Sequence, residues 1–181
     1  TLPRFQQTRG VLRLLALWVS RAYQEGYKGA QRDPLITLGT APLEDPMFRA
    51  AVFEQLGETK LEAAVTTDIA GKKDAHAVRL DAEAIDAIKK ARLHRKVATT
   101  IFFESNGGQV GADAQEASVP EIRLAVGEPE SDIGNIETVL EALTDACYYL
   151  NVEKTRYKFS LKENLNKRFA DRRATVQGPQ V

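Results

Sequence analysis

The segment 135–161, NIETVLEALTDACYYLNVEKTRYKFSL, decides the fold because it joins an amphipathic helix directly to a short β-hairpin. Within residues 135–150, apolar residues recur at the spacing of one helix face: Ile136, Val139, Leu140, Leu143 and Cys147. In residues 148–161, aromatic and polar side chains alternate on both sides of the turn VEKT, which predicts two short strands. A helix followed at once by a hairpin is how a winged helix-turn-helix domain ends.

The residues upstream of this segment supply the other helices of such a domain. Ser118 and Glu121 form a capping box before the apolar stretch PEIRLAV, which predicts a helix over residues 119–126. Residues 81–105 are helical in character, with a break in the basic stretch KKARLHRK, and residues 106–118 form a Gly-rich loop. The order helix, helix, helix, hairpin predicts a winged-helix domain over residues 81–174.

The first 80 residues are also mainly helical. Residues 8–24 form an amphipathic helix whose apolar stripe consists of Leu12, Leu15, Val19, Ala22 and Tyr23, and Gly26 and Gly29 are expected to end it. A second helix begins at Asp45 with Pro46 in its first turn and stops at Gly57. The pattern of residues 58–80 is mixed. It indicates the end of a helix that leads into a strand, followed by a second strand that would pair with the first.

These patterns predict a mainly α fold with a small β component. A helical part (1–80) precedes the winged helix (81–174), and residues 175–181 form a tail. The 181 residues are 43% hydrophobic and 28% charged with zero formal net charge, so only local clusters can direct the chain to nucleic acid. The one cysteine, the lack of a signal peptide and the lack of a long apolar run favour a cytoplasmic protein with no membrane partner.

The sequence contains no motif for catalysis or for metal binding. The P-loop GxxxxGK[ST], HExxH, CxxC and GxSxG are all absent. His76 and His94 are interpreted as ordinary surface or partly buried residues rather than ligands, and Cys147 as a core residue. The aromatic side chains are more typical of core packing than of base stacking: Trp18, Phe102, Phe103, Tyr148 and Tyr149. The sequence therefore predicts no catalytic residue and no metal site.

Two arginines stand in the first turns of the helix at 8–24, on either side of Gly10. Cations there oppose the positive end of the helix dipole, so we expect a group outside the helix to need Arg9 or Arg13. Gly10 to Arg13 has the form GxxR, which resembles the sensor 2 motif in the lid of AAA+ ATPases. The resemblance implies that Arg13 contacts the γ-phosphate of a bound nucleotide, with Arg9 as the nearest substitute and Gly10 leaving room for the approach. A surface arginine on a core helix is the alternative.

A set of ordered segments extends this resemblance to residues 5–173: TRGVLRLLA, DPLI, ATTIFFES, EIRLAV and RYKFSLKENLNK. The chain is similar in these segments to the family known as domain-of-unknown-function 499, predicted AAA+ ATPases of bacteria and archaea. The resemblance implies a P-loop, ATP and Mg²⁺ in a part of the protein upstream of Thr1, and a lid-derived origin for residues 1–80. A chain that starts without methionine agrees with a segment cut from a longer protein.

The charged residues of the expected winged helix favour two different kinds of partner. The helix that would enter a DNA groove carries Glu137, Glu141 and Asp145 and no cation, which favours packing or protein contact. The hairpin and tail are basic, through Lys154, Arg156, Lys158, Lys162, Lys167, Arg168, Arg172 and Arg173. These cations predict weak, salt-sensitive phosphate contact. The expected function is a non-catalytic AAA+ segment that couples nucleotide state to a partner or nucleic acid. The alternatives are a stand-alone winged-helix DNA-binding module and a protein-interaction scaffold.

Overall fold

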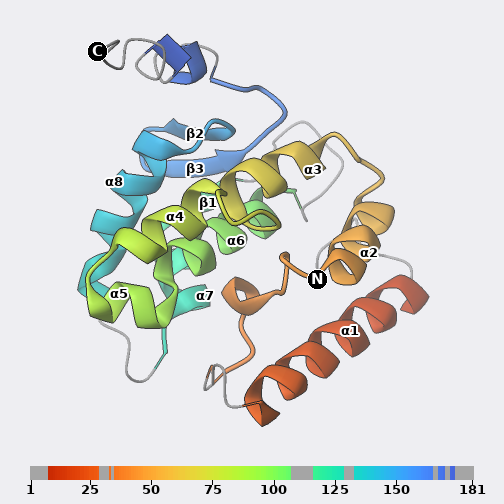
Figure 1. Ribbon diagram of the computed structural model, residues 1–181. Helices are drawn as coiled ribbons and strands as arrows, with labels where there is room; N and C mark the ends of the chain where they lie inside the picture. Colours follow the sequence, from red (N-terminus) through yellow and green to blue (C-terminus); the bar gives the residue numbers. More distant parts are fainter. Residues whose placement is uncertain are drawn as a thin grey trace, which may run out of the picture.

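The structure, a computed structural model, describes residues 8–28, 33, 35–106, 116–128, 133–164, 167–169 and 172–173 (Figure 1). It is mainly helical with a small antiparallel sheet, as the sequence predicts. The α-helices are α1 (Thr8–Tyr27), α2 (Pro46–Leu56), α3 (Leu61–Ala64), α4 (His76–Glu83), α5 (Asp86–Ala91), α6 (Leu93–Asn106), α7 (Val119–Val126) and α8 (Ile136–Ala146). Short turns are η2 (Leu38–Thr40), the π-turn η3 (Val65–Ile69) and η4 (Ile133–Asn135), and the strands are β1 (Ala117–Ser118), β2 (Leu150–Glu153) and β3 (Arg156–Phe159). None of the helices in these ranges is long and apolar enough to cross a bilayer.

The C-terminal elements follow the order α6, β1, α7, α8, β2, β3, which is the winged-helix arrangement. The sheet has the order β1-β3-β2, and both pairs are antiparallel. Strands β2 and β3 lie within the hairpin that the alternating aromatic pattern predicts. Strand β1 lies in the segment expected to be a loop. The sequence did not predict this strand, because two residues are too few to show the alternation typical of a strand.

Helix α6 is the centre of the fold, with α4, α7, α8 and the turn η2 packed around it (Figure 1). It is buried on nearly all sides: Val97, Ala98, Ile101 and Phe102 are fully buried, and even Lys96 is only 4% exposed in its side chain. Arg92 adopts a left-handed conformation (φ 52°) between α5 and α6, which confirms the break expected in the basic stretch.

The two strands expected within residues 58–80 are wrong, because the structure places α3, η3 and α4 there. Leu61, Ala64, Val65, Asp68 and Ile69 are all buried, and this is the spacing of one helix face. The β-branched residues in the stretch AVTTDIA suggested a strand, but helical burial against α6 determines the local structure.

The domain boundary expected after residue 80 falls inside α4. Buried residues from both sides of it belong to one hydrophobic cluster, which runs from Leu14 to Phe159. Within the described part of the chain, the residues before and after this boundary therefore share one core. The boundary at residue 80 marks only a change in the order of secondary-structure elements along the chain.

Local capping signals are confirmed. Asp45 Oδ1 accepts hydrogen bonds from Met47 N (2.8 Å) and Phe48 N (3.0 Å) at the start of α2, and Gly57 ends that helix with φ 67°. Glu121 accepts from Ser118 N at 2.8 Å, which completes the capping box of α7. The hydrogen bonds from the Ser118 hydroxyl and the Ser118 backbone N–H lower the pKa of the Glu121 carboxyl below its ordinary value. Helix α1 instead continues past Gly26 to Tyr27, and Gly29 lies outside the described residues.

Candidate functional site

We call the hairpin formed by β2 and β3 the wing. The outward face of the wing is cationic. In the antiparallel register Arg156 lies opposite Glu153, and Lys158 lies opposite Asn151. Side chains alternate between faces along a strand, so Arg156 and Lys158 share the face opposite to that of buried Phe159. These two cations are therefore held side by side, away from the core.

Lys154 and Lys162 add to this cationic face. Lys154 stands at the hairpin turn in a left-handed conformation (φ 57°) and is exposed, and Lys162 is exposed just beyond β3. Within the described residues, none of the four hairpin cations, Lys154, Arg156, Lys158 and Lys162, takes part in an ion pair. Arg156 nevertheless lies opposite Glu153, and its charge helps to lower the pKa of the Glu121 carboxyl, so part of its charge is compensated within the chain.

The tail cations Lys167 and Arg168 instead each have a partner within the chain, although Arg168 stays exposed. Lys167 Nζ donates hydrogen bonds to the carbonyl oxygens of Thr144 and Cys147, at the C-terminal end of α8. A cation there is favourable because the last carbonyls of a helix carry partial negative charge. Arg168 pairs with Glu163 at 2.7 Å. Of the eight basic residues named from the sequence, the four hairpin cations face outward, Lys167 and Arg168 have partners within the chain, and Arg172 and Arg173 are exposed.

Helix α8 presents an acidic surface where a DNA-reading helix would present cations or amides. Glu137, Glu141 and Asp145 are all exposed, one helical turn apart along the same face. Glu137 pairs with Arg123 of α7, which neutralises only the first of them. A duplex would be repelled by these carboxylates, and the cations of this part of the chain lie on the hairpin instead.

Arg13 projects from α1 and pairs with Glu54 of α2 at 2.8 Å. Both side chains remain more than half exposed, 56% and 63%, so the pair is worth at most about 1 kcal/mol. Arg9 is also exposed, one turn away. The two arginines and Leu12 between them thus share an uncovered surface at the N-terminal end of the helix.

Gly10 has a packing role in the structure. It is buried where α1 packs against α2, and a Cβ atom built on it would meet the amide end of the Gln55 side chain. That end is flexible and can move aside, so the packing favours a small residue here without requiring glycine. This contact gives the glycine of GxxR a packing partner that involves no nucleotide.

A buried cluster that the sequence analysis missed joins the two parts of the chain. Asp68 in η3 is fully buried, and one oxygen accepts from Tyr148 N (3.1 Å) while the other accepts from Tyr149 N (2.6 Å). His76 Nδ1 lies 2.8 Å from Asp68 Oδ1, and the His76 ring meets the Tyr148 ring edge-on at 4.5 Å. The carboxylate therefore ties η3 and α4 to the residues that lead into the wing.

Cys147 lies beside this cluster, and the ligand atoms of Asp68, His76 and Cys147 all fall within 4.8 Å of one another. Burial, with the Asp68 charge nearby, raises the pKa of the Cys147 thiol well above its ordinary value. The carboxylate oxygens already accept backbone and imidazole hydrogen bonds. We therefore interpret the cluster as structural, which agrees with the core role expected for Cys147.

A second buried aspartate has a similar role. Asp81 of α4 accepts from His94 N at 2.9 Å and from Arg95 Nε at 2.9 Å, and His94 Nδ1 lies 3.1 Å from the same carboxylate. Both histidines are thus more deeply buried than the sequence suggested, each held by one carboxylate. The aromatic side chains also pack internally, as expected, for example Phe102 edge-on against Phe53 at 6.2 Å.

Comparisons of the chain with protein-family models, curated proteins and solved structures gave no match.

Proposed function

We propose that this chain is a non-catalytic segment of a cytoplasmic AAA+ ATPase, in which the winged helix holds a partner and α1 faces the nucleotide-binding core. ATP and Mg²⁺ would be bound by that core, upstream of Thr1. The observation that best supports the proposal is the uncovered surface of α1, where Arg9 and Arg13 stand beside the exposed side chain of Leu12. An exposed guanidinium in a weak ion pair is free to exchange its carboxylate for phosphate oxygens.

The first test of this proposal is the reading frame upstream of Thr1, which should encode a strand, GxxxxGK[ST] and a helix. In that longer protein, Arg13→Ala should lower ATP turnover on the order of tenfold, because the variant lacks the arginine that stabilises phosphate charge. Steady-state hydrolysis with saturating ATP measures the effect.

Glu54→Ala is the matched control, since it breaks the same ion pair and leaves the arginine in place. We expect turnover in Glu54→Ala to stay within about twofold of the wild type. If both variants lose activity equally, the arginine acts only through its pair with α2. If neither loses activity, Arg13 has no role in hydrolysis, and Arg9→Ala tests the remaining candidate.

We propose further that the partner held by the winged helix is a nucleic-acid backbone, contacted by the four outward hairpin cations. The acidic surface of α8 supports contact without base reading, so binding should be weak, independent of sequence and sensitive to salt. Fluorescence anisotropy with two labelled duplexes of unrelated sequence measures this. Equal affinities that fall steeply with added salt support the proposal. Absence of binding at low salt, or binding indifferent to salt, favours the protein-interaction alternative.

A further inference from the structure

The wing joins the core at Phe159, the last residue of β3, whose side chain is fully buried. Strand β3 lies between β1 and β2 in the sheet, and α6 packs against it (Figure 1). Ser160 N donates to Tyr149 O at 3.2 Å across the hairpin. Because hydrogen-bonded and non-hydrogen-bonded pairs alternate along an antiparallel ladder, Phe159 turns its N–H and C=O groups away from β2. These buried backbone groups need partners outside the hairpin.

Two side chains at the end of α6 provide these partners. Phe159 N donates a hydrogen bond to Ser105 Oγ at 3.2 Å, and Asn106 Nδ2 donates to Phe159 O at 3.0 Å. Both side chains also bond their own helix: Ser105 Oγ donates to Ile101 O, and Asn106 Nδ2 donates to Phe102 O at 3.0 Å. The side chains of α6 thus take the place of a neighbouring strand beside Phe159, and they tie the wing to the central helix of the fold.

This attachment lies next to the wing cations. Lys158 directly precedes Phe159, and its side chain leaves the opposite face of the strand. The chain beyond β3 is held as well, because Ser160 Oγ accepts from Asn151 Nδ2 at 2.9 Å and from Lys162 N at 3.2 Å. The backbone that carries Lys158 and Lys162 is therefore hydrogen-bonded on both sides of the point where α6 meets β3.

We propose that Asn106, together with Ser105, is a positioning residue for the wing, which keeps the hairpin cations in place before a partner binds. The inference rests on the function proposed above, in which the wing contacts a nucleic-acid backbone. A wing released from α6 must be ordered on binding, and this loss of entropy weakens the complex. The number of phosphates that are neutralised stays the same, because every cation is still present.

Asn106→Leu tests the proposal, since leucine has a similar volume and lacks both donors. We expect duplex affinity at low salt to fall about fivefold, while the slope of log affinity against log salt keeps its wild-type value. Loss of a phosphate-binding cation differs, because it also makes this slope shallower. Ser105→Ala, which removes the acceptor of Phe159 N, should act in the same way. Fluorescence anisotropy across a salt series measures both quantities. Wild-type affinity in Asn106→Leu overturns the proposal, as does a shallower slope.

Asp45→Ala is the matched control, because it also removes two hydrogen bonds at the end of a helix, the N-terminus of α2. Both variants should lower the midpoint of urea unfolding, and only Asn106→Leu should lower duplex affinity. If both variants lose affinity equally, Asn106 acts through overall stability alone and the proposal is wrong.

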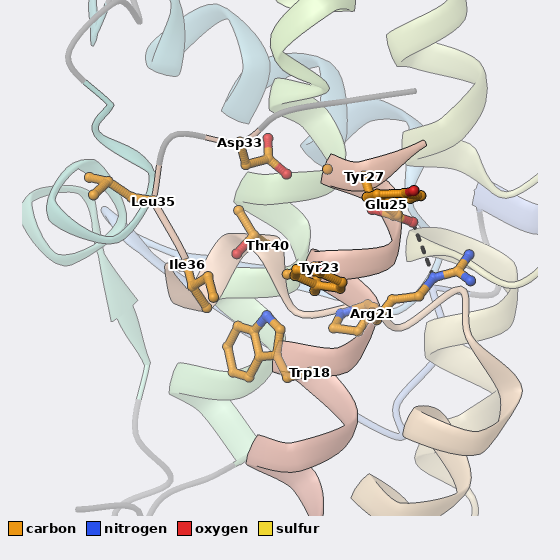
Figure 2. A pocket seen from close by; sticks show the side chains of 12 residues that line it. Trp18, Arg21, Tyr23, Glu25, Tyr27, Asp33, Leu35, Ile36 and Thr40 are labelled. Atoms are coloured by element: carbon orange, nitrogen blue, oxygen red, sulfur yellow. Dashed lines mark ion pairs between the residues drawn. The ribbon is translucent and has the colours of Figure 1, made fainter. Parts of the chain in front are cut away.

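Trp18 reports the unfolding of these variants from a site away from the wing. It is the only tryptophan of the chain and packs edge-on against Phe48 at 5.8 Å. Its side chain forms part of the wall of a hollow of about 480 Å³ between α1 and residues 33–42 (Figure 2). A wild-type emission spectrum in Asn106→Leu therefore shows that the packing of α1 is retained, so that a change in affinity comes from the wing.

Amide hydrogen exchange separates failure of this inference from failure of the proposed function. Phe159 N–H should exchange slowly in the wild type, because its acceptor Ser105 is buried. We expect Asn106→Leu to raise exchange rates in residues 156–159 about tenfold, and to leave those of α2 unchanged. Unchanged rates in β3 overturn the inference while the proposed function stands. A wild-type chain that binds no duplex overturns the proposed function, and with it the role of Asn106 in binding.

Discussion

Replacing Asp68 by alanine should lower the free energy of unfolding by about 3 to 5 kcal/mol. The substitution removes the carboxylate that accepts from the part-buried N–H groups of Tyr148 and Tyr149, and it removes the partner of His76 Nδ1. Each hydrogen bond lost at such a site costs about 1 to 3 kcal/mol, and the cavity left by the buried side chain adds to this. The midpoint and slope of urea unfolding, followed by far-UV circular dichroism, measure the decrease in stability.

Asp145→Ala provides the control for this result. Asp145 is an exposed carboxylate on α8, so its removal should change stability by no more than about 0.5 kcal/mol. Asp68→Asn should lie between the two, because the amide keeps one acceptor oxygen and turns an N–H group toward another donor. If Asp68→Ala is as stable as Asp145→Ala, the buried carboxylate does not hold the N-terminal part against the segment leading into the wing.

The winged helix was predictable from sequence because its signals are local. A capping box, an apolar stripe at helical spacing and an alternating aromatic hairpin each span fewer than about 16 residues and need no distant partner. The start and end of α2 were predictable for the same reason, since Asp45 and Gly57 act on the backbone within one helical turn.

The Asp68 cluster was not predictable, because its partners are 8 to 81 residues away in sequence. The only local indication of this cluster is one acidic residue inside the apolar stretch AVTTDIA. The β-branched residues beside it favoured a strand instead. The exposure of the apolar stripe of α1, formed by Leu12, Leu15, Val19 and Tyr23, was not predictable for a related reason. An apolar stripe predicts burial, but the sequence does not say whether the covering surface belongs to the same chain.

The GxxR motif shows that packing contacts alone can explain the residues of a short motif. Gly10 is buried against the flexible end of the Gln55 side chain, and Arg13 has a carboxylate within reach on the same neighbouring helix. The glycine and the arginine of the motif therefore both have contacts that involve no nucleotide. For this reason the Arg13 proposal depends on comparing Arg13→Ala with Glu54→Ala, and neither variant is informative alone.

Reversing three wing charges together, Lys154→Glu, Arg156→Glu and Lys158→Glu, should weaken duplex binding on the order of 100-fold at low salt. Each cation that neutralises a phosphate releases a counterion. The salt dependence of any remaining affinity should therefore also become shallower, by roughly one unit of log–log slope for each phosphate that is no longer neutralised. Fluorescence anisotropy across a salt series measures both quantities. The side chains concerned point away from the apolar face of the hairpin, so the fold should be retained.

The control is a variant with the same change in net charge at exposed lysines outside the winged helix: Lys60→Glu, Lys72→Glu and Lys73→Glu. A chain of zero net charge has no overall attraction to a duplex, so a local patch must supply it. The control should therefore bind nearly as tightly as the wild type, apart from a small uniform decrease in affinity. If both triple variants lose affinity equally, binding follows overall charge and the wing is not the interface. If neither loses affinity, another surface meets the phosphates, and the winged helix is left as a module for protein contact through its acidic α8.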